Sequence, residues 1–235
     1  MKRKFQHIAY LLMVAAVLTS CGEKKQISEF PDWAWADFQR PEGINPIVSP
    51  DTTTVFYCPM RQDSVAWESS DTFNPAATIY DGKVVVLYRA EDNSAVGIGS
   101  RTSRLGYAYS DDGLHFNRMT VPVFYPADDN QKELEWPGGC EDPRVAVTND
   151  GLYVMLYTQW NRKQARLAVA TSRDLQIWEK YGPAFAKAYG GRFFDEFSKS
   201  ASIVTKLVDG KQVIAKIDGK YWMYWGEKFV NVATS

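Results

Sequence analysis

The sequence predicts an all-β fold made of the antiparallel sheets of a β-propeller. Two markers that recur in the same order along the chain support this prediction. The first occurs as "DGKVVVLYR" from Asp81, "DGLYVMLYT" from Asp150 and "DGKYWMYWG" from Asp218, with starts 69 and 68 residues apart. The second follows each copy of the first, as "YAYSDDGLHF", "LAVATSRDLQIW" and "VNVATS", and its serines lie 62 and 63 residues apart. These spacings indicate a repeat protein.

The pattern inside each repeat indicates strands. Residues 84–88 and 153–157 are short runs rich in β-branched and aromatic residues, and an Asp-Gly pair, a common tight hairpin turn, opens each copy. Repeats of about 60 to 70 residues exceed the roughly 40 to 50 residues of simple propeller blades, so we expect the surplus to lie in loops. A β-sandwich with coincidental repeats is the alternative fold.

The N-terminal residues are predicted to be a signal peptide. Residues 1–4 are basic, residues 8–18 form an apolar run shorter than a comfortable membrane span, and "LTSC" follows. This pattern is typical of a bacterial lipoprotein, in which Cys21 is lipidated and anchors the chain at the outer membrane or the periplasmic face of the cell envelope. A short transmembrane anchor is the alternative.

Three segments follow from these patterns. We expect residues 1–20 to be the signal peptide, residues 21–69 a linker and lead-in segment, and residues 70–235 the propeller domain. Removal of the signal peptide leaves 24 basic against 28 acidic residues. This net negative charge of four excludes a nucleic-acid partner as the main expectation, and the oligomeric state stays open.

Cysteine and histidine usage limits the chemistry. His115 is the single histidine outside the signal peptide, which excludes a histidine metal cluster and leaves one candidate base for a Ser/His/Asp triad. No metal or cofactor is therefore expected. Cys58 and Cys140 either form one disulfide or stay as buried thiols. Carboxylates, arginines and aromatic rings are abundant, and these side chains suit the handling of sugars.

The segment "PGGCEDPR", residues 137–144, holds the candidate acid. Asp142 and Asn74 are each followed by a proline that lies seven and six residues, respectively, before the Asp-Gly pair of its repeat. Proline lacks an N–H group and forces the preceding residue into extended geometry, so both pairs belong at a strand entry. We expect the two side chains to converge at one mouth of the channel. Alternatively, Glu141 and Asp142 are turn carboxylates paired with Arg144.

Several segments resemble the β-mannoside phosphorylases and β-mannosidases of glycoside hydrolase family 130. They are "FNPAATIYDGKVVVLYR", "RLGYAYSDDGLHF", "GCEDPRVAV", "YVMLYTQW" and "LAVATSRDLQIWEKYGPAF", in the order expected over roughly residues 70–235. The resemblance implies a five-bladed propeller with a sugar pocket at one end of its channel. About three blades are present, and the positions that the family takes from later blades are missing here.

The resemblance also implies roles for individual residues. The catalytic acid of the family falls on Asp142. Asn74 and Arg89 match positions that hold the sugar in the minus-one subsite, and Arg144 is the arginine of the motif beside the acid. Lys199 matches a basic position that binds phosphate, although the acid that commonly follows it in phosphorylases is absent. The alternative for Arg89 is an arginine that only neutralises a neighbouring carboxylate.

The attacking group separates two activities. In the phosphorylases the acid protonates the glycosidic oxygen through a sugar hydroxyl and inorganic phosphate, as co-substrate, attacks the ring. In the hydrolases a carboxylate activates water, with about 6.5–9.5 Å between the two acids. Glu227 follows "DGKYWMYWG" at the end of a strand expected to line the channel. It is the candidate base, and a hairpin-turn glutamate in solvent is the alternative.

The predicted location in the cell envelope favours water over phosphate as the attacking group. Phosphorolysis conserves bond energy as a sugar phosphate, which benefits a cell only where the product stays in the cytoplasm. The sequence therefore predicts an inverting, exo-acting β-mannosidase that cleaves β-mannosidic links, including β-1,2 links, in mannan-derived oligosaccharides. A β-mannoside phosphorylase is the first alternative, and a non-catalytic sugar-binding or truncated fragment is the second.

Overall fold

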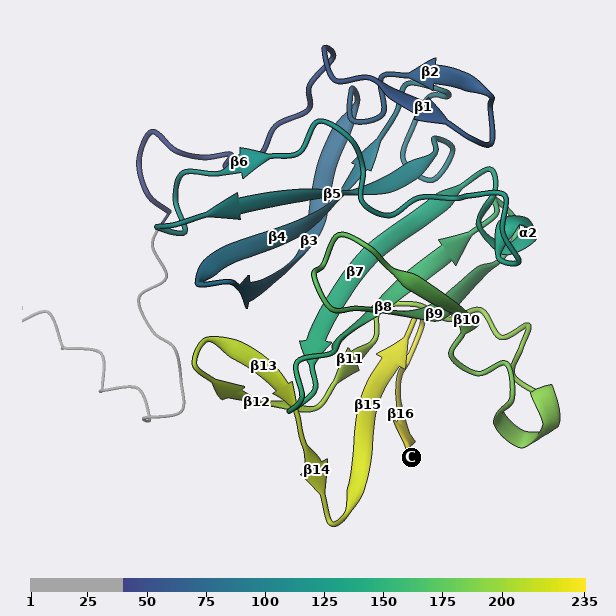
Figure 1. The fold of residues 1–235 in the computed structure, drawn as a ribbon. Helices are drawn as coiled ribbons and strands as arrows, with labels where there is room; N and C mark the ends of the chain where they lie inside the picture. Colours follow the sequence, from purple (N-terminus) through teal and green to yellow (C-terminus); the bar gives the residue numbers. More distant parts are fainter. Residues whose placement is uncertain (1–39) are drawn as a thin grey trace, which may run out of the picture. The chain divides into compact units, whose positions relative to one another are not determined.

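The structure is a computed structural model that describes residues 40–235. The predicted signal peptide, Cys21 and the first part of the lead-in segment lie outside the described residues. Residues 42–235 form one unit, in which antiparallel sheets follow one another along the chain (Figure 1). In this part of the chain no helix is long and apolar enough to cross a membrane.

Two sheets with the same strand order open the unit. The first has the order β3, β4, β5, β6 and the second has the order β7, β8, β9, β10. A single parallel pairing of Ser103 in β5 with Gly139 in β7 joins them. Their bounds are β3 Asp71–Tyr80, β4 Lys83–Glu91, β5 Ser103–Ser110, β6 Asn117–Arg118, β7 Gly139–Val147, β8 Tyr153–Trp160, β9 Ala165–Ser172 and β10 Glu179–Pro183.

The third sheet repeats this order with an interruption. Its first strand consists of two pieces, β11 and β14, which both pair with β15, and β16 pairs with the other edge of β15. A separate hairpin, β12–β13, fills the gap and touches β7 through the parallel pair of Val213 with Val147. The bounds are β11 Ser202–Ile203, β12 Thr205–Val208, β13 Lys211–Ile214, β14 Lys216–Ile217, β15 Lys220–Gly226 and β16 Val230–Thr234.

The predicted repeat is confirmed by these pairings. Residues 84–88 and 153–157 lie in β4 and β8, the second strands of their sheets, so they are equivalent as expected. The Asp-Gly pairs close the β3–β4 and β14–β15 hairpins, where Asp81 and Asp218 both have positive φ (49° and 51°) and are followed by glycines with positive φ. Two consecutive positive φ values define the type I′ turn that matches the twist of paired strands.

One expectation about the third sheet is wrong. The strand that ends before Glu227 was expected to line the channel, but β15 is flanked by β11 and β14 on one side and β16 on the other. It is therefore a second strand, like β4 and β8. The split first strand takes the place that the pattern assigned to β15.

Apolar side chains fill the space between neighbouring sheets. One cluster joins Leu87 and Leu105 of the first sheet to Met155 and Tyr157 of the second, and all four side chains are buried. Complete burial of such side chains contributes about 1.5–3 kcal/mol each. A second cluster joins Leu156, Leu167 and Ala201 across the second and third sheets. The sheets therefore pack face to face, as the blades of a propeller do.

The lead-in segment packs on the first sheet. Strands β1 (Phe56–Cys58) and β2 (Asp63–Val65) form a hairpin, and Trp67 is fully buried beside Tyr88. Cys58 and Cys140 are both buried free thiols, in different clusters. The disulfide left open by the sequence does not form in this structure. Short helical turns at Lys132–Glu135 (α2) and Ala188–Gly191 lie in connections between strands.

Candidate active site

Equivalent bulges interrupt β3 and β7. The register of β3 against β4 shifts between Phe73 and Ala76, and that of β7 against β8 shifts between Glu141 and Arg144. The residues in the two bulges are Asn74-Pro75 and Asp142-Pro143. Asn74 and Asp142 have φ values of 45° and 51°, the left-handed region that asparagine and aspartate tolerate better than most residues. Backbone strain of this kind gathers at functional sites.

The bulges bring the two side chains together. Asn74 Nδ2 donates a hydrogen bond of 2.9 Å to Asp142 Oδ1, and Arg89 Nη1 donates to the same oxygen at 3.1 Å. Asp142 Oδ2 accepts no hydrogen bond from the described residues. Because both donors stabilise negative charge on Oδ1, a proton bound by Asp142 belongs on Oδ2. The Asp142 side chain is 13% exposed, so it is in partial contact with solvent.

Arg89 is buried among three carboxylates. Its side chain is 4% exposed, and Nη2 donates to Glu91 Oε1 at 2.5 Å and to Glu141 Oε1 at 2.9 Å. Its Nε donates to Ser103 Oγ at 3.0 Å. Four of its five N–H groups are thus engaged by protein groups, and the fifth, on Nη1, has no partner among residues 40–235. Arg89 therefore neutralises neighbouring carboxylates, Asp142 among them, and its contact with the sugar stays a prediction.

The excess of acids over bases changes proton affinities at this site. Burial, together with the neighbouring Asp142 and Glu91, raises the pKa of Glu141 to about 7, although Arg89 opposes the shift. Burial by itself lowers the pKa of Arg89, but Glu141, Asp142 and Glu91 outweigh it and raise that pKa. Near neutral pH Glu141 therefore exchanges a proton beside a permanently charged arginine.

The raised pKa of Glu141 predicts a pH-dependent stability. Its ordinary value is 4.5, so between pH 4.5 and 7 the folded protein holds the proton more tightly than the unfolded chain. The free energy of unfolding then falls as the pH rises through this window, by up to about 3 kcal/mol from this group. Glu141→Gln resembles the neutral acid, so we expect its stability relative to the wild type to rise from pH 5 to pH 8.

Urea unfolding at the two pH values measures this difference. Glu133→Gln, at an exposed glutamate of α2, is the matched control and should follow the wild type at both values. Parallel pH dependences for Glu141→Gln and the wild type would show that Glu141 titrates normally.

The remaining predicted residues lie apart from this cluster. Arg144 is exposed, and its Nη1 donates to the carbonyl oxygen of Pro143 at 2.7 Å rather than to Glu141 or Asp142. Lys199 forms an ion pair of 3.2 Å with Glu227, which is 41% exposed. No hydrogen bond or ion pair among the described residues joins Lys199 or Glu227 to Asp142. The structure thus brings together Asn74, Arg89 and Asp142, and separately Lys199 and Glu227.

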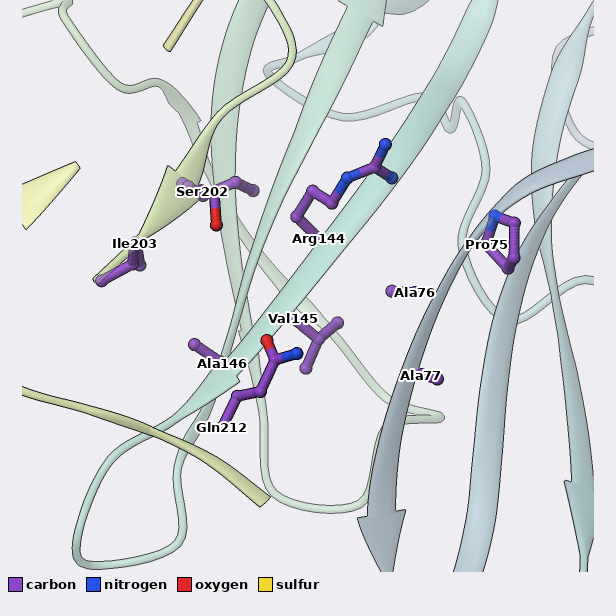
Figure 2. Close-up of a pocket in the computed structure, with 10 residues that line it drawn as sticks. Pro75, Ala76, Ala77, Arg144, Val145, Ala146, Ser202, Ile203 and Gln212 are labelled. Atoms are coloured by element: carbon purple, nitrogen blue, oxygen red, sulfur yellow. The ribbon is translucent and has the colours of Figure 1, made fainter. Parts of the chain in front are cut away.

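A cavity of about 190 Å³ lies where the first strands of the three sheets meet. Figure 2 shows residues 75–77 of β3 on one side of β7, and Ser202 and Ile203 of β11 on the other. Arg144 lines the cavity between them, two residues after Asp142. The bulges of β3 and β7 therefore stand beside a space that three sheets share.

The sequence did not predict that Glu91 and Glu141 belong to the site. Glu91 lies two residues after Arg89, and residues i and i+2 of a strand point to the same face, so the signal was present in "YRAE". The sequence predicts Glu141 only as a turn carboxylate paired with Arg144, whereas in the structure Glu141 pairs with Arg89. Among residues 40–235 no group of three or more His, Cys, Asp and Glu side chains is placed to hold a metal ion.

The fold and the site define a β-propeller in which the bulges of two neighbouring sheets bring Asn74 and Asp142 together beside a buried arginine. A family model described as "beta-1,4-mannooligosaccharide phosphorylase" matches residues 39–234. The chain belongs to glycoside hydrolase family 130, whose members are five-bladed propellers, and it contains about three of the blades.

Two curated relatives come from Thermoanaerobacter sp. (strain X514). A "1,2-beta-oligomannan phosphorylase" is 36% identical over 152 residues, which cover 63% of this chain and 46% of the relative. A "Beta-1,2-mannobiose phosphorylase" is 32% identical over 160 residues, which cover 63% of this chain and 47% of the relative. The chain therefore spans about half the length of the curated relatives it matches.

One similar solved structure carries the description "The GH130 family of mannoside phosphorylases contains glycoside hydrolases that target beta-1,2 mannosidic linkages in Candida mannan". It is 69% identical to this chain with a TM-score of 0.85, and the match covers 88% of this chain and 57% of that chain. The three-sheet arrangement is thus shared with an experimentally solved relative over most of the described residues.

Proposed function

We propose that the complete protein cleaves β-1,2-mannosidic bonds in mannan-derived oligosaccharides, with Asp142 as the general acid. The observation that supports this proposal is the convergence of Asn74 and Arg89 on Oδ1 of Asp142, which leaves Oδ2 to carry the proton. The substrate class comes from the relatives, whose names and descriptions include β-1,2-mannosides. Anchoring of the protein in the cell envelope through Cys21 belongs to this proposal and is supported by the sequence pattern before that residue.

Water is the attacking group that the geometry favours. The ion pair places the carboxylate of Glu227 3.2 Å from Lys199, the cation that the sequence analysis assigned to phosphate. A carboxylate at this distance neutralises the lysine and repels a phosphate anion, while it can accept a proton from water. The solved structure at 69% identity, described with glycoside hydrolases, also supports hydrolysis.

Phosphate is the second candidate. The family model and both curated relatives are named as phosphorylases, so they support this alternative better than the hydrolysis that the sequence analysis put first. In this case Lys199 leaves Glu227 to bind phosphate, and Arg144, which is exposed and free of carboxylate partners among the described residues, supplies a second cation.

The product of cleavage separates the two candidates. The full-length gene product, incubated with β-1,2-mannobiose in phosphate-free buffer, should release free mannose at a rate that added phosphate leaves unchanged. Product identification by NMR would reveal mannose 1-phosphate if phosphate attacks. Cleavage that requires phosphate and yields mannose 1-phosphate would replace hydrolysis by phosphorolysis, and the absence of any cleavage would refute the proposed function.

A further inference from the structure

We infer that Ser200 belongs to the same sugar-binding site as Asn74 and Asp142. Its hydroxyl group hydrogen-bonds a hydroxyl of the bound mannose. This inference rests on the proposed function for the identity of the sugar. It adds a contact from the third sheet to those of Asn74 and Asp142 from the first and second sheets.

Backbone pairing places Ser200 in the same position as the other two residues. Arg89, Thr158 and Gly226 are each the ninth residue of the repeated "DG" segments. Arg89 pairs with the residue before Asn74, and Thr158 pairs with the residue before Asp142. Gly226 N donates at 3.0 Å to the carbonyl oxygen of Lys199, the residue before Ser200.

The local conformation agrees with this equivalence. Ser200 has a φ of 54°, close to the 45° of Asn74 and the 51° of Asp142. Positive φ alone is not specific, because other residues of the chain share it in turns. Asn74, Asp142 and Ser200 share both the positive φ and the same position in their sheets. Each lies directly before the point where the first strand of its sheet resumes pairing with the second strand. The strands that follow them line one cavity, to which Ser202 and Ile203 contribute from the third sheet (Figure 2).

Residues on both sides fix Ser200 in place. Ser198 N donates to the carbonyl oxygen of Ala165 at 3.1 Å, and Ser198 Oγ accepts from Leu167 N at 3.0 Å. Ala201 is 2% exposed in the cluster between the second and third sheets. Ser200 is therefore held in place on both sides, by Ser198, which is hydrogen-bonded to β9, and by Ala201, which is buried.

The Ser200 side chain is available for a ligand. The residue is exposed, and its hydroxyl group makes no hydrogen bond within the part of the chain that the structure describes. A hydroxyl group can donate and accept one hydrogen bond at once, which matches a sugar hydroxyl. It carries no charge, so it contributes to sugar binding and leaves proton transfer to Asp142.

The test separates the side chain from the backbone. Ser200→Gly removes the hydroxyl group while glycine adopts positive φ without strain, so the fold should be retained. In the full-length protein we expect KM for β-1,2-mannobiose to rise about 3- to 10-fold, the loss of one neutral hydrogen bond, with little change in kcat. Asparagine tolerates positive φ and carries a polar side chain. Ser200→Asn should therefore recover part of the affinity for the sugar.

A matched control removes another exposed polar side chain at positive φ. Gln62→Gly, at a residue with a φ of 53° in the β1–β2 turn, should leave KM unchanged. An unchanged KM in Ser200→Gly, or an equal rise in Gln62→Gly, would overturn the role of Ser200 while the cleavage activity stands. If the wild type cleaves nothing, calorimetric titration with β-1,2-mannobiose decides. Weaker binding by Ser200→Gly supports the inference, whereas equal binding, or none by the wild type, overturns it.

Discussion

Asp142→Asn is expected to reduce β-mannoside cleavage by the full-length protein by at least about 10²- to 10⁴-fold, the usual contribution of a general acid. An amide cannot supply the proton that leaves Oδ2. Its oxygen can still accept hydrogen bonds from Asn74 and Arg89, which meet at Oδ1 in the structure. The geometry of the mouth should therefore survive, and the loss should appear in kcat rather than in folding.

Asp81→Asn provides the matched control. Asp81 is an exposed aspartate at a φ of 49° in the β3–β4 turn, so the same chemical change occurs on the same backbone conformation away from the site. Rates with β-1,2-mannobiose and urea unfolding curves should match the wild type for this variant. If Asp142→Asn kept half of the wild-type activity, another group would be the acid.

Glu227→Gln is expected to cost hydrolysis a comparable factor, about 10²- to 10⁴-fold, because an amide cannot accept a proton from the attacking water. The substitution also releases Lys199 from its ion pair. The freed lysine should bind phosphate more readily. The products of this variant are therefore assayed for mannose 1-phosphate. Release of mannose is measured with and without phosphate.

Glu133→Gln, at the exposed glutamate of α2, should leave both rates unchanged. An almost fully active Glu227→Gln enzyme whose product is mannose 1-phosphate would refute hydrolysis and establish phosphate as the attacking group. The ion pair predicts a large loss of mannose release, with mannose 1-phosphate formed only when phosphate is added and far more slowly than the wild type releases mannose.

The sequence predicted the first two sheets and their share of the site because short, local signals mark them. An Asp-Gly pair lies in the β3–β4 and β7–β8 connections, and a proline follows Asn74 and Asp142. The extended strand entry predicted from each proline is wrong, because both residues have positive φ in bulges inside β3 and β7. The third sheet keeps the Asp-Gly pair, at Asp218, but lacks the proline. Ala201 replaces the proline, and the β12–β13 hairpin lengthens the distance from Ser200 to the Asp-Gly pair at Asp218. The pattern that marks Asn74 and Asp142 therefore does not reveal Ser200.

Glu91 and Glu141 were not predicted from the sequence because their roles depend on buried contacts. The roles of Glu91 and Glu141 depend on contacts with Arg89 across 2 and 52 positions of the chain. The first is a same-face relation within one strand that a period of two can suggest. The second requires that two sheets pack together, and a pattern within either sheet does not contain that information.

The contact between Arg89 and Asp142 has a consequence for the order of folding. It joins residues 53 positions apart, in the second strand of one sheet and the first strand of the next. The acid and its arginine can therefore meet as soon as the first two sheets have docked, before the third sheet has formed. During folding the proton donor would be assembled early, while the surface that receives the rest of the sugar would be completed by later segments.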